Sequence, residues 1–174
     1  VNQSAPPFII DSVASLDGLT VVDHGAASFI YFPGPDQRKA EKIRDAINAS
    51  WEHGSALLRA DAPESWHVTE TAGFADIIVQ ADPRYTVYSS MEKAGHGSIG
   101  DHGWAPDFKD MHGIFLASGP RLPKGVLIPS INVVDVYPLL TEILELPKTS
   151  LIDGDPELLP GLYLPSTKST TTAR

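Results

Sequence analysis

Short apolar runs bounded by Gly, Pro or Asp are the feature that most constrains how this chain folds. The first three runs, at residues 8–10, 19–22 and 29–32, are rich in β-branched or aromatic residues, and this composition is typical of β-strands. Short apolar runs lie at residues 8–10, 19–22, 29–32, 56–58, 76–80, 85–88 and 112–117. The run 76–80 contains Ile77-Ile78-Val79, and its continuous apolar character indicates a strand buried on both faces.

A first amphipathic helix is predicted between these runs, at residues 36–50. Asp36 precedes the apolar pattern and is the expected N-cap. The predicted core-facing residues recur at helical spacing. They are Ala40, Ile43, Ala46 and Ile47.

A second helix is predicted at residues 134–146. Because Pro138 lacks an amide hydrogen, it belongs in the first turn, and Asp135 is therefore a better N-cap than Asn132. The predicted buried stripe consists of Leu139, Leu140, Ile143 and Leu144. Strands interleaved with helices indicate an α/β fold.

Composition excludes several classes of function. The 174 residues are enough for one ordinary domain with its own core. The net charge of −9 argues against a nucleic-acid backbone or an anionic membrane surface as the main partner. Without cysteine, the chain has no disulfides, no zinc–cysteine site and no thiol nucleophile. No apolar run reaches the roughly 18 residues that a membrane span needs.

Residues 92–113 are the strongest candidate for chemistry, since they combine five Gly and three His with little apolar periodicity. Imidazole is a good zinc ligand, and flanking glycines let the backbone bring the ring to an ion. The run Gly100-Asp101-His102-Gly103 is the centre of this candidate. His96 lies close in sequence but is not expected to bind the metal directly, and His112 is a candidate for a supporting residue.

Several separated motifs resemble the nucleotide pyrophosphatase/phosphodiesterase family of the alkaline phosphatase superfamily. They are Gly100–Trp104, the run from Asp110 to Pro120, the run from Asn132 to Leu140, and Ile152-Asp153-Gly154-Asp155-Pro156, preceded by weaker matches at residues 63–67 and 76–82. The resemblance covers most of residues 20–158, in the family's order. It implies a partial alkaline-phosphatase-like sheet flanked by helices, which would be the C-terminal portion of a catalytic domain at residues 1–165, with a disordered tail at 166–174.

The resemblance places His102 on the family's last zinc-ligand histidine. The family often follows this motif with Tyr-Asp-Asn, whereas this chain has Trp104-Ala105-Pro106. Asp23 and His24 are second candidates, because the family has an Asp-His-Gly-Met metal motif after a strand. Here Gly25 is not followed by Met, and no Ser precedes Asp23. We therefore expect the Thr or Ser nucleophile and the other ligands to lie upstream, in the missing N-terminal half of the same domain.

The implied function is zinc-dependent hydrolysis of a phosphodiester or pyrophosphate bond in a small substrate such as a nucleotide, with two zinc ions in the complete site. The chain alone is then expected to be inactive. One alternative is a non-catalytic binding module that retains the fold, and another is a related hydrolase acting on phosphomonoesters or phosphonates. Family habit implies an extracytoplasmic location, periplasmic or secreted. In a eukaryotic secretory route, Asn2 and Asn48 would be glycosylation sequons.

Overall fold

The structure, a computed structural model, describes residues 5–66, 68, 73–94, 102–128, 130–147 and 152–155. It divides into two compact units, Val1–Gly113 and Ile114–Arg174. Each unit is described by itself.

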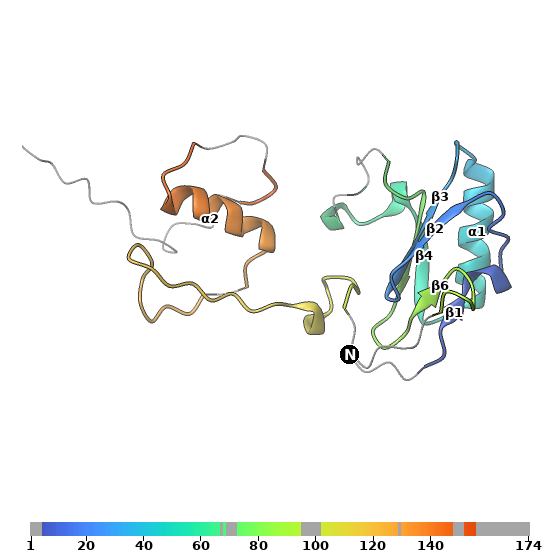
Figure 1. The fold of residues 1–174 in the computed structure, drawn as a ribbon, viewed down its shortest axis with the longest axis horizontal. Coiled ribbons are helices and arrows are strands. Elements are labelled where there is room, and N and C mark those ends of the chain that lie inside the picture. The colour runs from blue at the N-terminus through green and yellow to red at the C-terminus, as the bar shows by residue number, and fades with distance from the viewer. Residues whose placement is uncertain are drawn as a thin grey trace, which may run out of the picture. The chain divides into compact units, whose positions relative to one another are not determined.

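A four-stranded antiparallel sheet forms the centre of the first unit (Figure 1). Its strands are β2 (Thr20–Asp23), β3 (Ala27–Tyr31), β4 (Gly54–Leu58) and β5 (Ile77–Ala81), in the spatial order β2-β3-β5-β4. Two shorter strands, β1 (Phe8–Ile9) and β6 (Val87–Tyr88), pair in parallel as a separate small sheet. The α/β class predicted from the sequence is confirmed.

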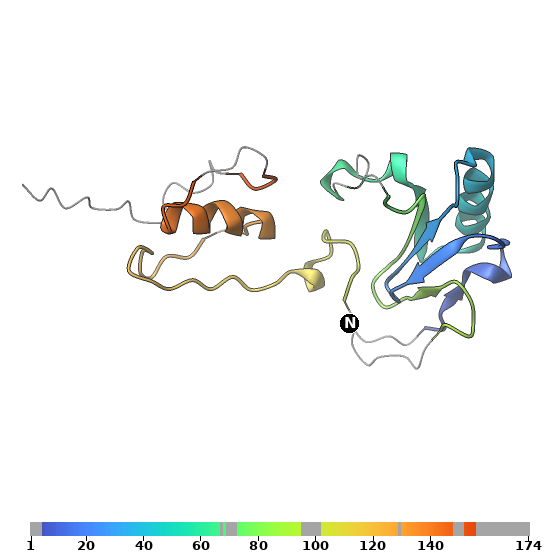
Figure 2. The same cartoon turned by 45° about the horizontal axis from the view of Figure 1, so that its top comes forward.

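Helix α1 (Gln37–Ser50) covers one face of the four-stranded sheet (Figure 2). The backbone nitrogen of Lys39 donates to the Asp36 carboxylate at 3.0 Å, so Asp36 is the N-cap that the sequence predicts. Ala40, Ile43 and Ile47 are buried against the sheet, and these side chains join the largest hydrophobic core of the unit. Because burial of this apolar stripe adds to the cap, α1 is held both locally and by packing.

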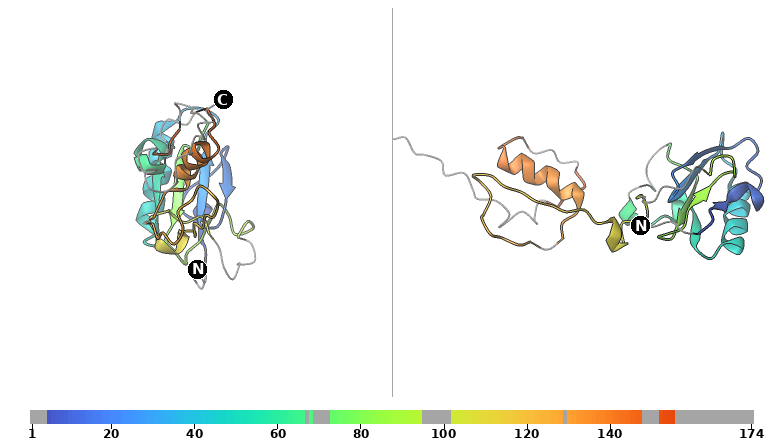
Figure 3. Two further views of the ribbon diagram at one scale, coloured as in Figure 1. Left: turned by 90° about the vertical axis from the view of Figure 1, so that its left-hand side faces the viewer. Right: turned by 60° about the horizontal axis from the view of Figure 1, so that its bottom comes forward.

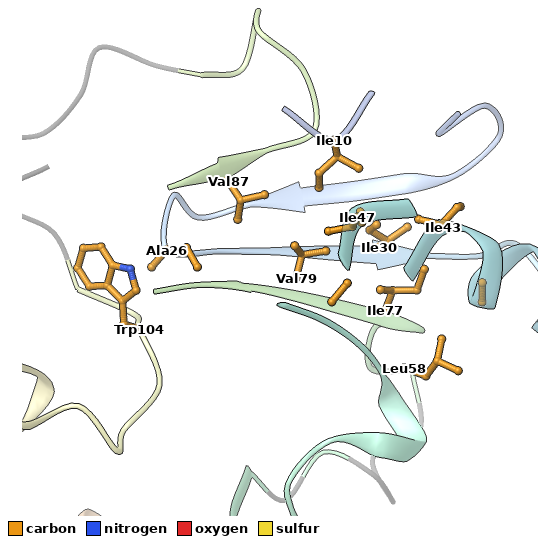
Figure 4. Close-up of a cluster of buried hydrophobic side chains, with 13 residues drawn as sticks. Ile10, Ala26, Ile30, Ile43, Ile47, Leu58, Ile77, Val79, Val87 and Trp104 are labelled. Atoms are coloured by element: carbon orange, nitrogen blue, oxygen red, sulfur yellow. The ribbon is translucent and has the colours of Figure 1, made fainter. Parts of the chain in front are cut away.

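Strand β5 lies between β3 and β4 and is the most buried strand. Ile77, Ile78 and Val79 are all buried, as their continuous apolar run predicts. Ile77 and Val79 pack into the core shown in Figure 4. A strand paired on both edges satisfies its backbone groups, so its side chains can be apolar on both faces.

Other predicted strands differ in extent from those observed. Ile10 belongs to a short 3₁₀ turn (Ile10–Ser12) rather than to β1. Tyr85 lies in a turn in which its nitrogen donates to the Asp82 carbonyl, so β6 contains only Val87 and Tyr88. The strand predicted at 112–117 is wrong. Within the described residues that run pairs with no strand, and Ile114 is 89% exposed.

The second unit contains helix α2 (Val136–Ile143), which follows a 3₁₀ turn at Val133–Asp135. The carboxylate of Asp135 accepts from the backbone nitrogens of Asn132 and Asp155, both at 2.9 Å. Asp135 is the N-cap residue of α2, as the sequence predicts, but its side chain makes no capping hydrogen bond to the helix, because its carboxylate binds the nitrogens of Asn132 and Asp155 instead.

The buried stripe predicted for α2 is only partly correct. Leu139 is 3% exposed, but Leu140 and Leu144 are exposed. Arg121 binds the carboxyl end of the helix, where its Nη1 donates to the Ile143 carbonyl at 2.7 Å. Figure 3 shows this helix, in orange, beside the extended segment that precedes it.

Large exposed apolar side chains are concentrated in the second unit. Among the described residues, the exposed large hydrophobics of this unit are Ile114, Phe115, Leu116, Val126, Leu127, Val133, Val134, Tyr137, Leu140, Leu144 and Leu146. In the first unit only Val22 and Met91 belong to this class. The second unit therefore presents apolar surface of the kind that elsewhere marks a contact face.

Candidate metal-ligand site

His102 is exposed, and the next residue, Gly103, lies beside Ala26 of the β2–β3 hairpin. Gly103 has a φ of +102°, a conformation that favours glycine, and a Cβ built there would lie 3.6 Å from the Ala26 Cβ. Trp104 is buried, and its indole nitrogen donates to the Tyr85 carbonyl at 3.2 Å. Figure 4 shows Trp104 beside Ala26 at the end of the strands.

The tip of this hairpin contains the second candidate pair, Asp23 and His24. The tip is closed by the backbone nitrogen of His24, which donates to the Ala27 carbonyl at 2.8 Å. Gly25 adopts a φ of +76°, which a side chain would disfavour. His24 is exposed, and its ring lies edge-on to Phe29 with centroids 5.8 Å apart.

Asp23 is buried, with 6% of its side chain exposed, and both of its carboxylate oxygens accept hydrogen bonds from the protein. Oδ1 accepts from the Ser28 hydroxyl at 2.7 Å and from the Ser89 nitrogen at 2.9 Å. Oδ2 accepts from the Ser89 hydroxyl at 2.6 Å, and Lys93 Nζ lies 4.0 Å away. These contacts give Asp23 a structural role, and the sequence analysis did not identify its serine partners.

The described residues contain no group of three or more His, Cys, Asp or Glu side chains arranged to hold a metal ion. His96 and Asp101 lie outside the described residues, as does Asn2. The ring of His112 is placed in a local contact, with its Nε2 lying 3.1 Å from the Pro106 carbonyl. Of the predicted ligands, Asp23, His24 and His102 lie within the described residues.

Asn48, the other predicted glycosylation site, connects α1 to β4. Its Oδ1 accepts from the Ala56 nitrogen at 2.7 Å, and its Nδ2 donates to the Ala56 carbonyl at 3.0 Å. A glycan attached to Nδ2 would compete with this pairing.

A surface pocket of about 550 Å³ lies at the opposite end of β3 from His102. It is lined by Tyr31 and Phe32, the start of α1, Arg59 and Phe74. Asp76 takes part in its wall, and its carboxylate accepts from the Phe32 nitrogen at 2.8 Å. None of the predicted metal ligands lines this pocket.

Comparison with known proteins defines the class to which this fold belongs. The human ectonucleotide pyrophosphatase/phosphodiesterase 5 structure matches with a TM-score of 0.80 and 25% identity, over 94% of this chain and 42% of that chain. The sheet and helices described above are thus part of an alkaline-phosphatase-like α/β fold.

Sequence comparison finds relatives in the same family. Human ectonucleotide pyrophosphatase/phosphodiesterase family member 5 is 28% identical over 137 residues, which cover 79% of this chain and 28% of that protein. The human bis(5'-adenosyl)-triphosphatase ENPP4 is 28% identical over 137 residues, covering 79% of this chain and 29% of the relative. No family model matches. Over the matched part, the chain is a relative of the nucleotide pyrophosphatase/phosphodiesterase family, which confirms the resemblance carried by its motifs.

The matches also define how much of a relative this chain represents. It spans 28% of the length of the human family member 5 and 42% of the solved chain. Within the described residues, no helix combines the length and apolar character required to cross a bilayer.

Proposed function

We propose that this chain supplies His102 as one ligand of a two-zinc centre that hydrolyses phosphodiester or pyrophosphate bonds. The observation that carries the proposal is the placement of His102: the residue is exposed, Gly103 lies beside Ala26 of the β2–β3 hairpin, and Trp104 is buried with its indole bound to the Tyr85 carbonyl. An exposed imidazole on an anchored backbone can offer a nitrogen lone pair to zinc. The family similarity supports zinc over other metals.

A single imidazole does not complete a zinc site. Catalytic zinc uses three protein ligands and keeps a position open for water or substrate. The proposal therefore assigns the remaining ligands, and a Thr or Ser nucleophile, to another part of the catalytic domain. Lewis-acid polarisation of a phosphate oxygen is the chemistry that bound zinc supplies in such sites. The part of His102 is to hold one ion in a fixed position.

The apolar surface of the second unit supports a partner for this chain, namely the rest of the catalytic domain. Leu116 is 89% exposed and Leu127 is 97% exposed, whereas side chains of this type are usually buried. The chain corresponds to 28% of a relative's length, so the rest of a catalytic domain is the natural cover for these residues. The name of the human family member 5 carries the prefix ecto-, and an extracytoplasmic location is part of this proposal.

Zinc binding by the isolated 174-residue chain is the first test. Isothermal titration calorimetry with zinc should detect only weak binding, because His102 alone provides one ligand. Tight binding of two zinc ions would contradict the proposed division of ligands.

The second test uses the complete polypeptide that carries these residues. The His102→Ala variant should retain less zinc after dialysis than the parent protein, whereas the control His53→Ala, in a turn before β4, should retain the same amount. Hydrolysis of bis-p-nitrophenyl phosphate should exceed that of p-nitrophenyl phosphate. Preference for the monoester would favour the phosphomonoesterase alternative, and unchanged zinc in His102→Ala would refute the role of His102.

A further inference from the structure

Two attachments connect described residues on either side of His102 to the β2–β3 hairpin. Ser89 binds Asp23, and Gly103, the residue after His102, lies beside Ala26. The first attachment is polar, and the second consists mainly of packing. They are linked through Tyr85, four residues before Ser89, because its carbonyl accepts from the Trp104 indole.

The attachment at Ser89 depends on one carboxylate. Asp23 accepts from both the nitrogen and the hydroxyl of Ser89, at 2.9 Å and 2.6 Å. Its third short bond comes from the Ser28 hydroxyl, at 2.7 Å, which links the two strands of the hairpin. Hydrogen bonds to a carboxylate are shorter and stronger than those between neutral groups, so this attachment is stiff.

Backbone pairing reinforces the same attachment. The Val87 nitrogen donates to the Gly25 carbonyl at 2.8 Å, and the Ser28 hydroxyl lies 3.2 Å from the Val87 carbonyl. Residues 87–89 are thus bound to the tip of the hairpin through main chain and side chain alike. Any rotation of the tip would be transmitted to Ser89.

The attachment at the other end is made by Gly103 and Trp104. A Cβ built on Gly103 would lie 3.6 Å from the Ala26 Cβ, in ordinary van der Waals contact, and the φ of +102° favours glycine at this position. Trp104 fills the space at the end of the core and donates its indole hydrogen to Tyr85, four residues before Ser89. Both ends therefore meet within one small region of the unit.

We propose that Asp23 and Trp104 are positioning residues for His102, holding its backbone so that the imidazole meets the metal at a fixed place. The inference rests on the proposed function of His102 and adds two residues to it. It also assigns a different role to the Asp23-His24 pair, whose sequence resembles a metal motif. With both oxygens of Asp23 bound by serines, its carboxylate anchors the backbone that carries the ligand.

The physical basis is that metal affinity depends on how precisely a ligand is held. A metal-binding side chain must stay within about 0.5 Å of its productive position, and residues that fix a ligand typically contribute 10- to 100-fold to affinity or activity. Removal of the Asp23 carboxylate should therefore weaken zinc binding by about tenfold or more, even though Asp23 does not touch the metal.

Four variants of the complete polypeptide test this inference: Asp23→Ala, Asp23→Asn, Trp104→Phe and the control Asp76→Ala. Asp76 is a matched control, because its carboxylate also accepts a backbone hydrogen bond, 2.8 Å from the Phe32 nitrogen, at the far end of β3. Zinc retained after dialysis against graded chelator and exchange of the Trp104 indole hydrogen are the readouts.

Asp23→Ala should lose zinc at about tenfold lower chelator concentration and exchange its indole hydrogen faster. Asp23→Asn keeps an acceptor for Ser28 and for the Ser89 nitrogen and should restore most of the zinc affinity. Trp104→Phe keeps an aromatic ring in the core but removes the indole donor, and it should weaken zinc binding. Equal zinc loss in Asp23→Ala and Asp76→Ala would overturn the inference, because stability alone would then explain it. If Asp23→Ala does not fold, unchanged zinc retention in Trp104→Phe overturns it. If His102→Ala retains as much zinc as the parent protein, the proposed function itself has failed. If His102→Ala loses zinc, the other variants test the positioning role alone.

Discussion

Truncation of Leu116 tests whether the apolar surface of the second unit is a buried interface in the complete catalytic domain. In this chain Leu116 is 89% exposed, so Leu116→Ala removes little burial. We expect the free energy of unfolding of the isolated chain to change by less than about 0.5 kcal/mol, as for ordinary surface substitutions.

The same substitution should be costly once the remaining part of the domain covers the side chain. Burying a leucine contributes about 1.5–3 kcal/mol, and an unfilled cavity raises the cost of Leu→Ala to about 2–5 kcal/mol. Leu139→Ala is the matched control. Leu139 is only 3% exposed in the isolated chain, so its truncation should destabilise α2 in both proteins.

Urea unfolding of the isolated chain and of the complete polypeptide, each with both variants, provides the measurement. A loss of about 2–5 kcal/mol for Leu116→Ala in the complete polypeptide alone would support the interface. An equally small change in both proteins would refute the reasoning, since Leu116 would then remain at the surface. Size-exclusion chromatography of the isolated chain gives a second readout, because uncovered apolar surface promotes self-association.

Two further predictions concern the first unit and are checked by urea unfolding. Asp36→Ala removes the acceptor of the Lys39 nitrogen and should cost about 1 kcal/mol, whereas Asp36→Asn should cost much less; equal losses would show that the cap is not what stabilises α1. Gly54→Ala would bring a Cβ to 2.6 Å from the Gln80 carbonyl oxygen of the paired strand and should cost about 1–3 kcal/mol or more. Gly34→Ala is its control, because nothing lies within 4 Å of the added carbon, and equal stability of the two variants would contradict the steric argument.

Helix α1 and strand β5 could be predicted from sequence because their signals are local. The cap at Asp36 and the spacing of Ile43 and Ile47 lie within one segment, and the run Ile77-Ile78-Val79 carries its own evidence of burial. Each of these features needs no knowledge of a distant partner. Local propensity and tertiary packing agree at these positions, and these elements can therefore be predicted from the sequence.

The strand predicted at 112–117 shows the opposite case. Its composition is typical of a buried strand, but a strand exists only when another strand satisfies its backbone groups. Among the described residues none pairs with it, and Leu116 is left exposed. The prediction that Leu140 of α2 is buried is wrong for the same reason, since the periodicity of a helix identifies an apolar face but not what covers it. Leu116 and Leu140 both lie in the second unit, where the proposed partner would contribute the cover.

The candidate site depended on contacts that sequence spacing cannot supply. Asp23 and Ser89 are separated by 66 positions, and no local pattern connects a carboxylate after one strand to a serine after another. The family resemblance identified His102 as a candidate but offered no reason for its placement. The fixed position of Gly103 beside Ala26 emerges only once the strands have paired.

The tripeptide Asp-His-Gly occurs twice in this chain, at 23–25 and at 101–103, and we propose different roles for the two copies. Gly25 and Gly103 both have positive φ values, so in each copy the glycine permits a backbone course that other residues resist. In the first copy the carboxylate is occupied by serine donors and the turn closes a hairpin. The second copy is the one that presents its histidine while its glycine packs against that hairpin. The same three residues therefore yield an anchor in one place and a candidate ligand in the other.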